Sequence, residues 1–393
     1  MGFKFDLAII GGLGHVGLPL GIVFASKGKN VLLVDKNEGI KEKVMKGEMP
    51  FVEYGATKLL NKALKDELIS VSTDKSNISK AENIIICIGT PIDEYLNPKI
   101  KCFLEVIDEY AKYINKEQLV IIRSSIYPGV CLQVHRILGD SIPMSYCPER
   151  IVQGYAISEL DKLPQIISGF TEESVSKSAD LFSTITEKIV YSTISQAELM
   201  KLFSNSWRYI QFAATNQFYM ISEEAGENYS EIRNLMMEGY ARMSGFPSSG
   251  FTAGPCLLKD TMQLANISNN AHYLSQAAMH INEGMPSFLV KQIKEKTDLI
   301  DVTVGILGMA FKANIDDTRD SLSFKLKKIL SFEGAKVLCT DEHATIEGLL
   351  PLAEVIEKSS IIIIGAPHTA YRDLTISTDK MLIDIWNIVD KNE

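Results

Sequence analysis

The fold is decided near the start of the chain, by the stretch Leu7-Ala8-Ile9-Ile10-Gly11-Gly12-Leu13-Gly14-His15-Val16-Gly17. A short apolar run leads directly into a GxGxxG pattern, and a helical pattern opens at its last glycine. The first of these glycines (Gly12) permits a tight turn, the second (Gly14) lets the backbone approach a pyrophosphate, and the third (Gly17) lets the helix pack closely on the strand. The start of such a helix offers free N–H groups to phosphates. The stretch therefore predicts a dinucleotide-binding α/β domain.

An acidic residue stands where a domain of this kind needs one. Asp35 ends the next apolar run, Val31-Leu32-Leu33-Val34, about where a carboxylate meets the adenosine ribose. A carboxylate at that point would repel the 2′-phosphate of NADP, so NAD is the predicted cofactor. The alternative is a glycine-rich turn of an ordinary core, with Asp35 as a helix cap. Strand context and a correctly spaced acid favour the cofactor.

Short apolar runs alternate with helix-length stretches along the first half of the chain, which is typical of a parallel, doubly wound sheet. The expected strands are Leu7–Ile10, Asn30–Val34, Ile69–Val71, Asn83–Ile88, Leu119–Ile122 and Pro143–Cys147. The pattern changes near Ser195. A long helical pattern without Pro or Gly follows from Gln196 to about Gly226, then a Gly/Pro/Ser-rich loop at Gly245–Pro255, then more helix to about Lys296.

Strand–helix alternation returns from Asp301, with expected strands at Thr303–Leu307, Lys336–Thr340, Ser360–Gly365 and Met381–Ile385. The predicted fold is α/β: two Rossmann-like, doubly wound parallel-sheet domains joined by a helical central domain with a long helix. The expected boundaries are 1–195 for the NAD-binding domain, 196–298 for the central domain and 299–393 for the last domain.

Composition excludes several classes of protein. The 393 residues are 46% apolar and 23% charged, with a formal charge of −9 and no Lys/Arg block, so we expect no nucleic-acid or membrane partner. No apolar run approaches the ~20 residues of a membrane helix, and the N-terminus does not resemble a signal peptide. The six cysteines are scattered without a CxxC pair, which indicates free thiols in the cytoplasm and no metal site.

Three further segments carry candidate chemistry. Tyr-Cys-Pro-Glu-Arg ends at Glu149 and Arg150, and a later helical segment places Lys201 and Asn205 at i,i+4 on one face. The third segment, Gly-Phe-Thr-Ala-Gly-Pro-Cys-Leu-Leu-Lys-Asp, presents Cys256 from a glycine-rich loop, with Lys259 and Asp260 directly behind it. Each feature alone has a structural explanation. Cys256 could be a buried thiol, Lys201 and Asn205 could lie on the solvent-exposed edge of an amphipathic helix, and Glu149 could cap a turn. Their order along one chain is more specific than any of them.

Together these segments resemble the UDP-glucose/GDP-mannose dehydrogenase family, including its UDP-N-acetylhexosamine branch, over nearly the whole chain. The stretch Gly308-Met-Ala-Phe-Lys-Ala-Asn-Ile-Asp-Asp-Thr-Arg-Asp-Ser looks like the family's FKxxxxDxRxS segment, and His368 and Asp384-Ile-Trp-Asn resemble later landmarks. The resemblance implies an NAD-dependent nucleotide-sugar 6-dehydrogenase with a UDP-sugar-binding last domain. It also implies a homodimer formed through the long helix, and a role in supplying precursors for a surface polysaccharide.

The resemblance also assigns roles to residues. Cys256 is the expected nucleophile, which holds the aldehyde intermediate as a thiohemiacetal and then a thioester. Lys201 and Asn205 are expected to stabilise oxyanion charge, Asp260 to hold water, and Glu149 to act as a base. The other expected site residues bind either the cofactor or the substrate. The cofactor-binding set is Gly12, Gly14, Val16, Gly17, Asp35, Thr90, Ser125 and Arg319, and the substrate-binding set is Glu149, Arg150, Lys201, Arg242 and Lys312. Arg242 is expected to reach the donor across the dimer interface.

The chain departs from the family pattern at a few positions. The usual GGxC reads Ala253-Gly254-Pro255-Cys256, and alanine restricts the backbone wherever a positive φ is required. Gln153 stands where many UDP-glucose enzymes have a second glutamate, which favours the N-acetylhexosamine branch, whereas the residues flanking Cys256 look more like the UDP-glucose branch. The sequence does not decide the sugar of the donor, or whether its nucleotide is UDP or GDP.

Two other classes of protein also remain as alternatives. One is a single-step β-hydroxyacid or 6-phosphogluconate-type dehydrogenase, and the other is a non-catalytic NAD-binding member of the family.

Overall fold

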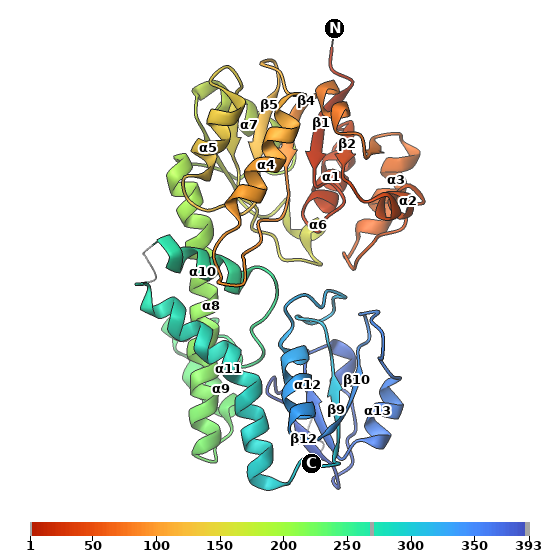
Figure 1. The fold of residues 1–393 in the computed structure, drawn as a ribbon, viewed down its shortest axis with the longest axis vertical. Coiled ribbons are helices and arrows are strands. Elements are labelled where there is room, and N and C mark those ends of the chain that lie inside the picture. Colours follow the sequence, from red (N-terminus) through yellow and green to blue (C-terminus); the bar gives the residue numbers. More distant parts are fainter. Residues whose placement is uncertain (1, 268–270, 390–393) are drawn as a thin grey trace. The chain divides into compact units, whose positions relative to one another are not determined.

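The computed structural model describes residues 2–267 and 271–389. The chain divides into two compact units, Met1–Ser204 and Asn205–Glu393, each with its own sheet (Figure 1). The long helix α8 (Ile194–Glu224) begins in the first unit and continues into the second. Each unit has its own hydrophobic core, built where strands of buried Val, Ile and Leu are covered by helices.

The first unit is built on an eight-stranded sheet of order β3-β2-β1-β4-β5-β6-β7-β8 within the described residues. The first six strands follow the Rossmann order, and the pairing is parallel throughout except between β6 and β7. The strands are β1 (Phe5–Ile10), β2 (Val31–Val34), β3 (Ile69–Ser72), β4 (Ala81–Ile86), β5 (Leu119–Ile122), β6 (Met144–Tyr146), β7 (Gln165–Gly169) and β8 (Ile189–Tyr191).

Helices cover both faces of this sheet. Leu7 and Ile9 of β1 pack with α1, α3 and α7 on one face, whereas Ala8 and Ile10 pack with α4 and α5 on the other. This alternation follows from the two-residue period of a strand. The helices are α1 (Gly17–Ser26), α2 (Glu38–Met45), α3 (Ala56–Lys65), η1 (Lys75–Lys80), α4 (Ile100–Ala111), α5 (Val130–Leu138), α6 (Ala156–Glu159) and α7 (Glu172–Ser183).

The second unit combines helices with a smaller sheet. Helices α8 and α11 lie side by side, and Asn216 of α8 donates a hydrogen bond to Asn282 of α11 at 2.9 Å (Figure 1). The helices after α8 are α9 (Tyr229–Met237), η2 (Ala241–Met243), α10 (Leu257–Ile267), α11 (Tyr273–Lys296), α12 (Leu322–Phe332), α13 (Leu352–Lys358) and η3 (Thr369–Tyr371).

The sheet of the second unit is parallel, with the order β10-β9-β11-β12. Its strands are β9 (Thr303–Leu307), β10 (Lys336–Thr340), β11 (Ile361–Ile364) and β12 (Met381–Ile383). Helices α11 and α12 pack on one face and α13 on the other. The crossovers on both faces make this a second doubly wound sheet.

The predicted fold class is confirmed, with one departure in detail. Strands β7 and β8 were not expected from the sequence, and β7 pairs antiparallel with β6. Strand β8 is three residues long and largely exposed, so it lacks the buried apolar run by which the other strands are recognised. The three domain boundaries stay predictions.

Each of the two sheets has the same local arrangement at the end of its first strand. Gly11 follows β1 with φ +74°, and its N–H donates to Val34 of β2 at 2.9 Å. Gly308 follows β9 with φ +96°, and its N–H donates to Thr340 of β10, also at 2.9 Å. The next residue after β2 is Asp35 and the next after β10 is Asp341. Each sheet therefore places a carboxylate beside the loop that leaves its first strand.

Candidate active site

The glycine loop of the first unit has the geometry that its sequence predicts. A Cβ on Gly12 would lie 2.7 Å from the Ile9 carbonyl oxygen and 2.9 Å from Leu33 Cα, so a side chain cannot fit there. A Cβ on Gly17 would collide with the Gly11 carbonyl oxygen. A Cβ on Gly14 would have one neighbour within 4 Å, the Gly11 oxygen at 3.5 Å, among the described residues. Gly14 therefore faces open space, which suits the close approach of a pyrophosphate.

Helix α1 and Asp35 complete this corner. Val16 precedes α1, which has no side-chain cap and no acidic residue in its first turn within the described chain. The positive end of the helix is thus left for an anion. The Asp35 carboxylate accepts a hydrogen bond from the Leu13 N–H at 3.2 Å, which places it against the glycine loop at the end of β2. These residues fit NAD, with Asp35 positioned for a ribose.

Thr90 and Ser125 lie at the carboxyl ends of neighbouring strands, β4 and β5, and are brought together. The Thr90 hydroxyl donates a hydrogen bond to the Ser125 carbonyl oxygen. Ligands of open α/β sheets bind outside these strand ends. The two predicted cofactor residues therefore lie at the expected edge of the sheet.

A buried ion pair, absent from the sequence-based set, holds Glu149. The Arg123 side chain is 1% exposed, and its Nε donates to Glu149 Oε2 at 2.8 Å, with a second bond from Nη2 to the same oxygen. The other carboxylate oxygen accepts the N–H groups of Arg150 at 2.7 Å and Ile151 at 3.0 Å. The signal that could have revealed Arg123 is a charged residue placed directly after the buried strand β5.

Two side chains near Glu149 have further contacts in the first unit. Gln153 Nε2 lies 3.1 Å from His15 Nδ1, and the His15 ring packs on Phe51 at 4.0 Å between centroids. Gln153 therefore contacts the glycine loop itself. The Arg150 guanidinium donates to the Pro164 carbonyl oxygen at 2.5 Å.

In the second unit, Cys256 lies at the start of a helix. Its side chain is exposed, and its carbonyl oxygen accepts the N–H of Asp260 at 2.9 Å as α10 begins. Arg319 is close enough for their charges to interact. The pKa of Arg319 is raised, chiefly by its hydrogen bonds to Asp317 and in smaller part by the negative charge of a Cys256 thiolate. A cation and a helix N-terminus both favour the thiolate form of a cysteine.

Asp260 lies one turn behind Cys256 in a buried polar contact. Its carboxylate oxygen Oδ2 accepts a hydrogen bond from Asn205 Nδ2 at 2.6 Å, and Lys259 Nζ forms an ion pair with Oδ1 at 3.0 Å. Asp260 is 1% exposed and Asn205 8%. Two predicted catalytic residues, far apart in the sequence, are thus in direct contact.

The loop before Cys256 is held from several sides within the second unit. Asn216 Oδ1 accepts the Gly250 N–H at 3.0 Å, and the Trp386 ring packs against Gly250, where φ is +151°. The Phe311 ring packs against Gly254, whose φ is +97°. Ala253 does not adopt a positive φ, so alanine at this position causes no backbone strain.

The remaining predicted residues have varied surroundings. Lys201 lies on α8, one turn before Asn205, and is 8% exposed, whereas Lys312 follows β9 and is half-buried. Arg242 is exposed and lies over the Tyr240 ring. His368 is fully buried, with both ring nitrogens engaged by other residues of the second unit. It therefore packs inside the domain and does not present its ring to a donor.

Within residues 2–267 and 271–389, no helix is long and apolar enough to cross a membrane. The same residues contain no cluster of three or more His, Cys, Asp or Glu side chains suited to a metal ion.

Comparison with known proteins matches most of the chain to three family models. They are the NAD binding domain of the UDP-glucose/GDP-mannose dehydrogenase family at residues 6–189, its central domain at 195–284 and its UDP binding domain at 305–391. A UDP-N-acetyl-D-mannosamine dehydrogenase of Methanocaldococcus jannaschii is 32% identical over 97% of this chain and 88% of its own. A UDP-glucose 6-dehydrogenase of Rickettsia felis is 27% identical over 96% of this chain and 92% of its own.

A solved structure has the same fold along its length. The UDP-D-ManNAc dehydrogenase of Pyrococcus horikoshii matches with a TM-score of 0.90 at 25% identity, over 98% of this chain and 96% of that one. The predicted family and cofactor are thereby confirmed. The chain belongs to the UDP-glucose/GDP-mannose dehydrogenase family and is an NAD-dependent nucleotide-sugar dehydrogenase.

Proposed function

We propose that this enzyme oxidises the C6 alcohol of a UDP-hexose, either a UDP-N-acetylhexosamine or UDP-glucose, to the uronic acid. The observation that carries the proposal is the arrangement around Cys256. An exposed thiol stands at the start of α10, and the buried Asp260–Asn205 pair lies one turn behind it. An enzyme that removed a single hydride would have no need of a nucleophilic thiol.

Bound NAD accepts one hydride in each of the two oxidations, so two NAD molecules are reduced for each sugar. Between the two oxidations, the Cys256 thiolate adds to the aldehyde carbon and forms a thiohemiacetal, which keeps the reactive aldehyde on the enzyme. The second oxidation leaves a thioester. Water attacks the thioester carbon, the C–S bond breaks, and the acid and the free thiol are released.

The other candidate catalytic groups have separate roles in this proposal. Asp260 orients the attacking water, and Asn205 fixes the Asp260 carboxylate through the 2.6 Å hydrogen bond. Lys201 stabilises the oxyanion formed when sulfur or water adds to the carbonyl carbon. These roles need the side chains to be fixed before substrate binds, and burial of Asp260 and Asn205 supplies that rigidity.

Glu149 is the proposed base for the hydrolytic step. Its carboxylate accepts bonds from Arg123 and from the N–H groups of Arg150 and Ile151. These contacts fix the orientation of Glu149, and they also compete for its lone pairs. In this proposal Glu149 takes a proton from water while Arg123 stays bound to Oε2.

The donor is proposed to contact Arg150, Lys201, Lys312 and Arg242, with Arg319 on the cofactor side. Among donors, UDP-N-acetyl-D-mannosamine is the first to test, because several related enzymes carry that name, those of Methanocaldococcus jannaschii and Campylobacter jejuni among them. Gln153 supports the same choice, since it contacts His15 where many UDP-glucose enzymes have a glutamate.

A homodimer is proposed to form through α8. Trp207, Phe218 and Ile221 are 60%, 42% and 54% exposed and recur on one side of the helix. Exposed apolar stripes of this kind are typical of interfaces. A cytoplasmic location and a role in surface polysaccharide synthesis stay predictions.

The proposal is tested with purified enzyme, NAD and a panel of UDP- and GDP-hexoses, following NADH by absorbance. We expect two NADH for each sugar consumed with the preferred UDP-hexose. Cys256→Ser should stop before the acid is released, and mass spectrometry of the sugar product identifies where it stops. One NADH per sugar with a ketone or aldehyde product would contradict the thiol mechanism.

Two other outcomes separate the competing classes. Turnover of a β-hydroxyacid in place of nucleotide sugars would favour the single-step dehydrogenase, although the match to a UDP binding domain at residues 305–391 disfavours it. NAD binding without NADH formation from any donor would indicate a non-catalytic member.

A further inference from the structure

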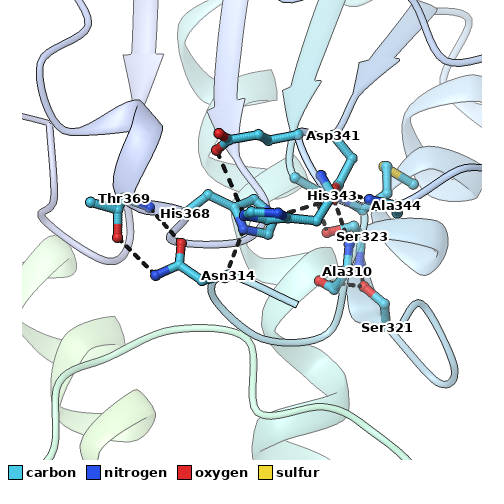
Figure 2. A network of polar contacts seen from close by, with 12 residues as sticks. Ala310, Asn314, Ser321, Ser323, Asp341, His343, Ala344, His368 and Thr369 are labelled. Carbon is cyan, nitrogen blue, oxygen red and sulfur yellow. Dashed lines mark hydrogen bonds and ion pairs between the residues drawn. The ribbon is translucent and has the colours of Figure 1, made fainter. Parts of the chain in front are cut away.

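A buried polar cluster of the second unit lies where three strands end. Asp341 follows β10, His368 follows β11, and the loop Met309–Asn314 follows β9. Figure 2 shows the His368 ring between the Asp341 carboxylate and Asn314. The side chains of His368 and Asp341 are both 0% exposed. Neither can touch a ligand, so their function must act through what they hold.

Asp341 is fully occupied by hydrogen bonds. Its Oδ2 accepts the N–H groups of Met309 at 2.6 Å and Ala310 at 2.8 Å, and Oδ1 accepts those of His343 and Ala344, both at 2.8 Å. Burial by itself raises the pKa of Asp341, but the bonds from His368 and from these N–H groups outweigh it and hold the pKa well below its ordinary value. The carboxylate therefore fixes the first residues of the loop.

His368 fixes the far end of the same loop. The Asn314 N–H donates to His368 Nδ1 at 2.9 Å. Because a backbone N–H can only donate, Nδ1 must be the unprotonated nitrogen and the ring proton lies on Nε2. Nε2 then donates to Asp341 Oδ2 at 3.2 Å. The ring thus links Asp341 to Asn314, and its tautomer is set by the two neighbours.

Asn314 needs this support because of its backbone conformation. Its φ is +56°, a left-handed conformation that side chains other than glycine adopt at a cost. Its amide also exchanges two hydrogen bonds with Thr369, from Nδ2 to Oγ1 at 2.8 Å and from the Thr369 N–H to Oδ1 at 2.9 Å. The loop is therefore clamped at both ends, by Asp341 at Met309 and by His368 and Thr369 at Asn314.

Phe311 lies between the two clamped ends and connects them to the nucleophile. A Cβ on Gly254 would lie 2.5 Å from Phe311 Cδ2 and 2.7 Å from Cε2, so the ring lies directly over Gly254. Gly254 is two residues before Cys256. The loop also approaches Arg319, because the Phe311 N–H donates to the Asp317 carbonyl oxygen at 3.0 Å and Asp317 binds the Arg319 guanidinium.

We propose that His368 is a positioning residue for Cys256: it holds the Met309–Asn314 loop so that Phe311 fixes the Gly254 backbone and keeps the thiol at the start of α10, beside Arg319. The role of Cys256 as nucleophile rests on the proposed function. The physical claim about its position does not, because the reactivity of a thiol can be measured without turnover.

The test compares two substitutions of His368, each of which can replace one of the two hydrogen bonds made by the imidazole ring. In His368→Asn, the amide oxygen can take the place of Nδ1 and accept the Asn314 N–H. In His368→Gln, the longer amide can donate to Asp341 in the place of Nε2 but leaves the Asn314 N–H without its acceptor. His343→Asn is the matched control, because the His343 ring packs on His368 at 5.0 Å between centroids, and its backbone N–H to Asp341 is retained.

Alkylation by iodoacetamide at neutral pH is followed by peptide mass spectrometry. Displacement from Arg319 and from the helix end lowers the thiolate fraction, so His368→Gln should slow alkylation of Cys256 roughly fivefold. His368→Asn and His343→Asn should stay within about twofold of the unmodified chain. The exposed thiol Cys102, in the first unit, is the internal standard and should not change. A normal Cys256 rate in His368→Gln, or an equal loss in His368→Asn, would overturn the proposal.

Thermal unfolding shows whether His368→Gln still folds. If it does not, a second variant, Phe311→Leu, tests the same proposal. Phe311→Leu keeps every bond of the cluster and removes the ring over Gly254, so it should slow Cys256 alkylation by the same factor. Kinetics complete the test: kcat of His368→Gln should fall about tenfold with NAD affinity unchanged. If the unmodified chain turns over no sugar, the proposed function fails while the alkylation result still decides the role of His368.

Discussion

Asn205 Nδ2 and Asp260 Oδ2 are 2.6 Å apart, and both side chains are buried. Burial of a carboxyl group costs free energy unless the group is paired and hydrogen-bonded, and Asp260, which is 1% exposed, has Lys259 and Asn205 as its partners. The contact joins α8 to the start of α10, the helix that follows Cys256. It therefore fixes the direction in which Asp260 faces.

The first prediction concerns Asp260 itself. Asp260→Asn keeps the shape but removes the charge that orients water, so we expect kcat to fall about a hundredfold, with the loss in thioester hydrolysis. Rapid-mixing measurement of NADH should then show a burst followed by slow turnover. Asp373→Asn makes the same chemical change at an exposed site and should leave both phases unaltered. Equal slowing of the burst would contradict a role limited to hydrolysis.

The second prediction separates the two small residues before Cys256. Gly254→Ala places a Cβ against Phe311 at a φ of +97°, and we expect it to lower the free energy of unfolding by about 1–3 kcal/mol and to reduce kcat strongly. Ala253→Gly should change stability by less than about 1 kcal/mol and leave kcat nearly unchanged, because Ala253 is not in a positive-φ conformation. Denaturant unfolding and steady-state kinetics measure both. Recovery of higher activity in Ala253→Gly would show that the alanine does constrain the loop.

The third prediction concerns the Arg123–Glu149 ion pair. Arg123→Met leaves a buried carboxylate without its partner, so we expect a loss of about 3–5 kcal/mol in the free energy of unfolding. Glu149→Gln in the same chain should restore part of that stability but none of the activity. A double-mutant cycle in urea measures the coupling. Additive losses from the two changes would show that the pair is not coupled.

The fourth prediction follows from Asp341. Because its pKa is lowered in the folded state, the stabilisation from its ionised form is fully present above the unfolded value of 3.8 and is lost as pH falls below it. Asp341→Asn should therefore destabilise the chain by about 2–4 kcal/mol near pH 7. The difference in the free energy of unfolding between Asp341→Asn and the unmodified chain should become smaller below pH 4, as urea unfolding at several pH values would show. Glu342→Gln, an exposed neighbour, should show no such convergence.

The fifth prediction tests assembly. Trp207→Glu places a charge in the exposed apolar stripe of α8, so analytical ultracentrifugation at micromolar concentration should shift from dimer to monomer. Lys291→Glu adds an acid to the exposed side of α11 instead and should leave the dimer intact. A dimer that survives Trp207→Glu would place the interface elsewhere on the chain.

Much of the fold could be predicted because its signals are local. The buried strand β1, the glycines after it and the acid after β2 are contiguous in sequence, and each has a specific steric or electrostatic cause. Strands β7 and β8 were missed because one begins with the polar residue Gln165 and the other is largely exposed. Their assignment depends on neighbours that the sequence alone does not order.

The candidate site was predictable in its residue types and less so in its contacts. Cys256, Asn205 and Asp260 were found from motifs, but the bond between Asn205 and Asp260 depends on how α8 and α10 pack. Arg123 and Asn216 were missed because neither belongs to a recognisable motif, and their partners are 26 and 34 residues away. Such contacts are tertiary and leave little trace in local sequence.

Asp35 and Asp341 occupy equivalent positions, but their carboxylates have different partners. Asp35 accepts the N–H groups of Leu13 and Asn37, whereas the fully buried Asp341 side chain accepts hydrogen bonds from four backbone N–H groups and His368. The fold thus places an acid at the same point of both sheets but encloses the second one. The buried Asp341 carboxylate cannot contact a ribose, so we expect the UDP binding domain to bind its nucleotide through other residues.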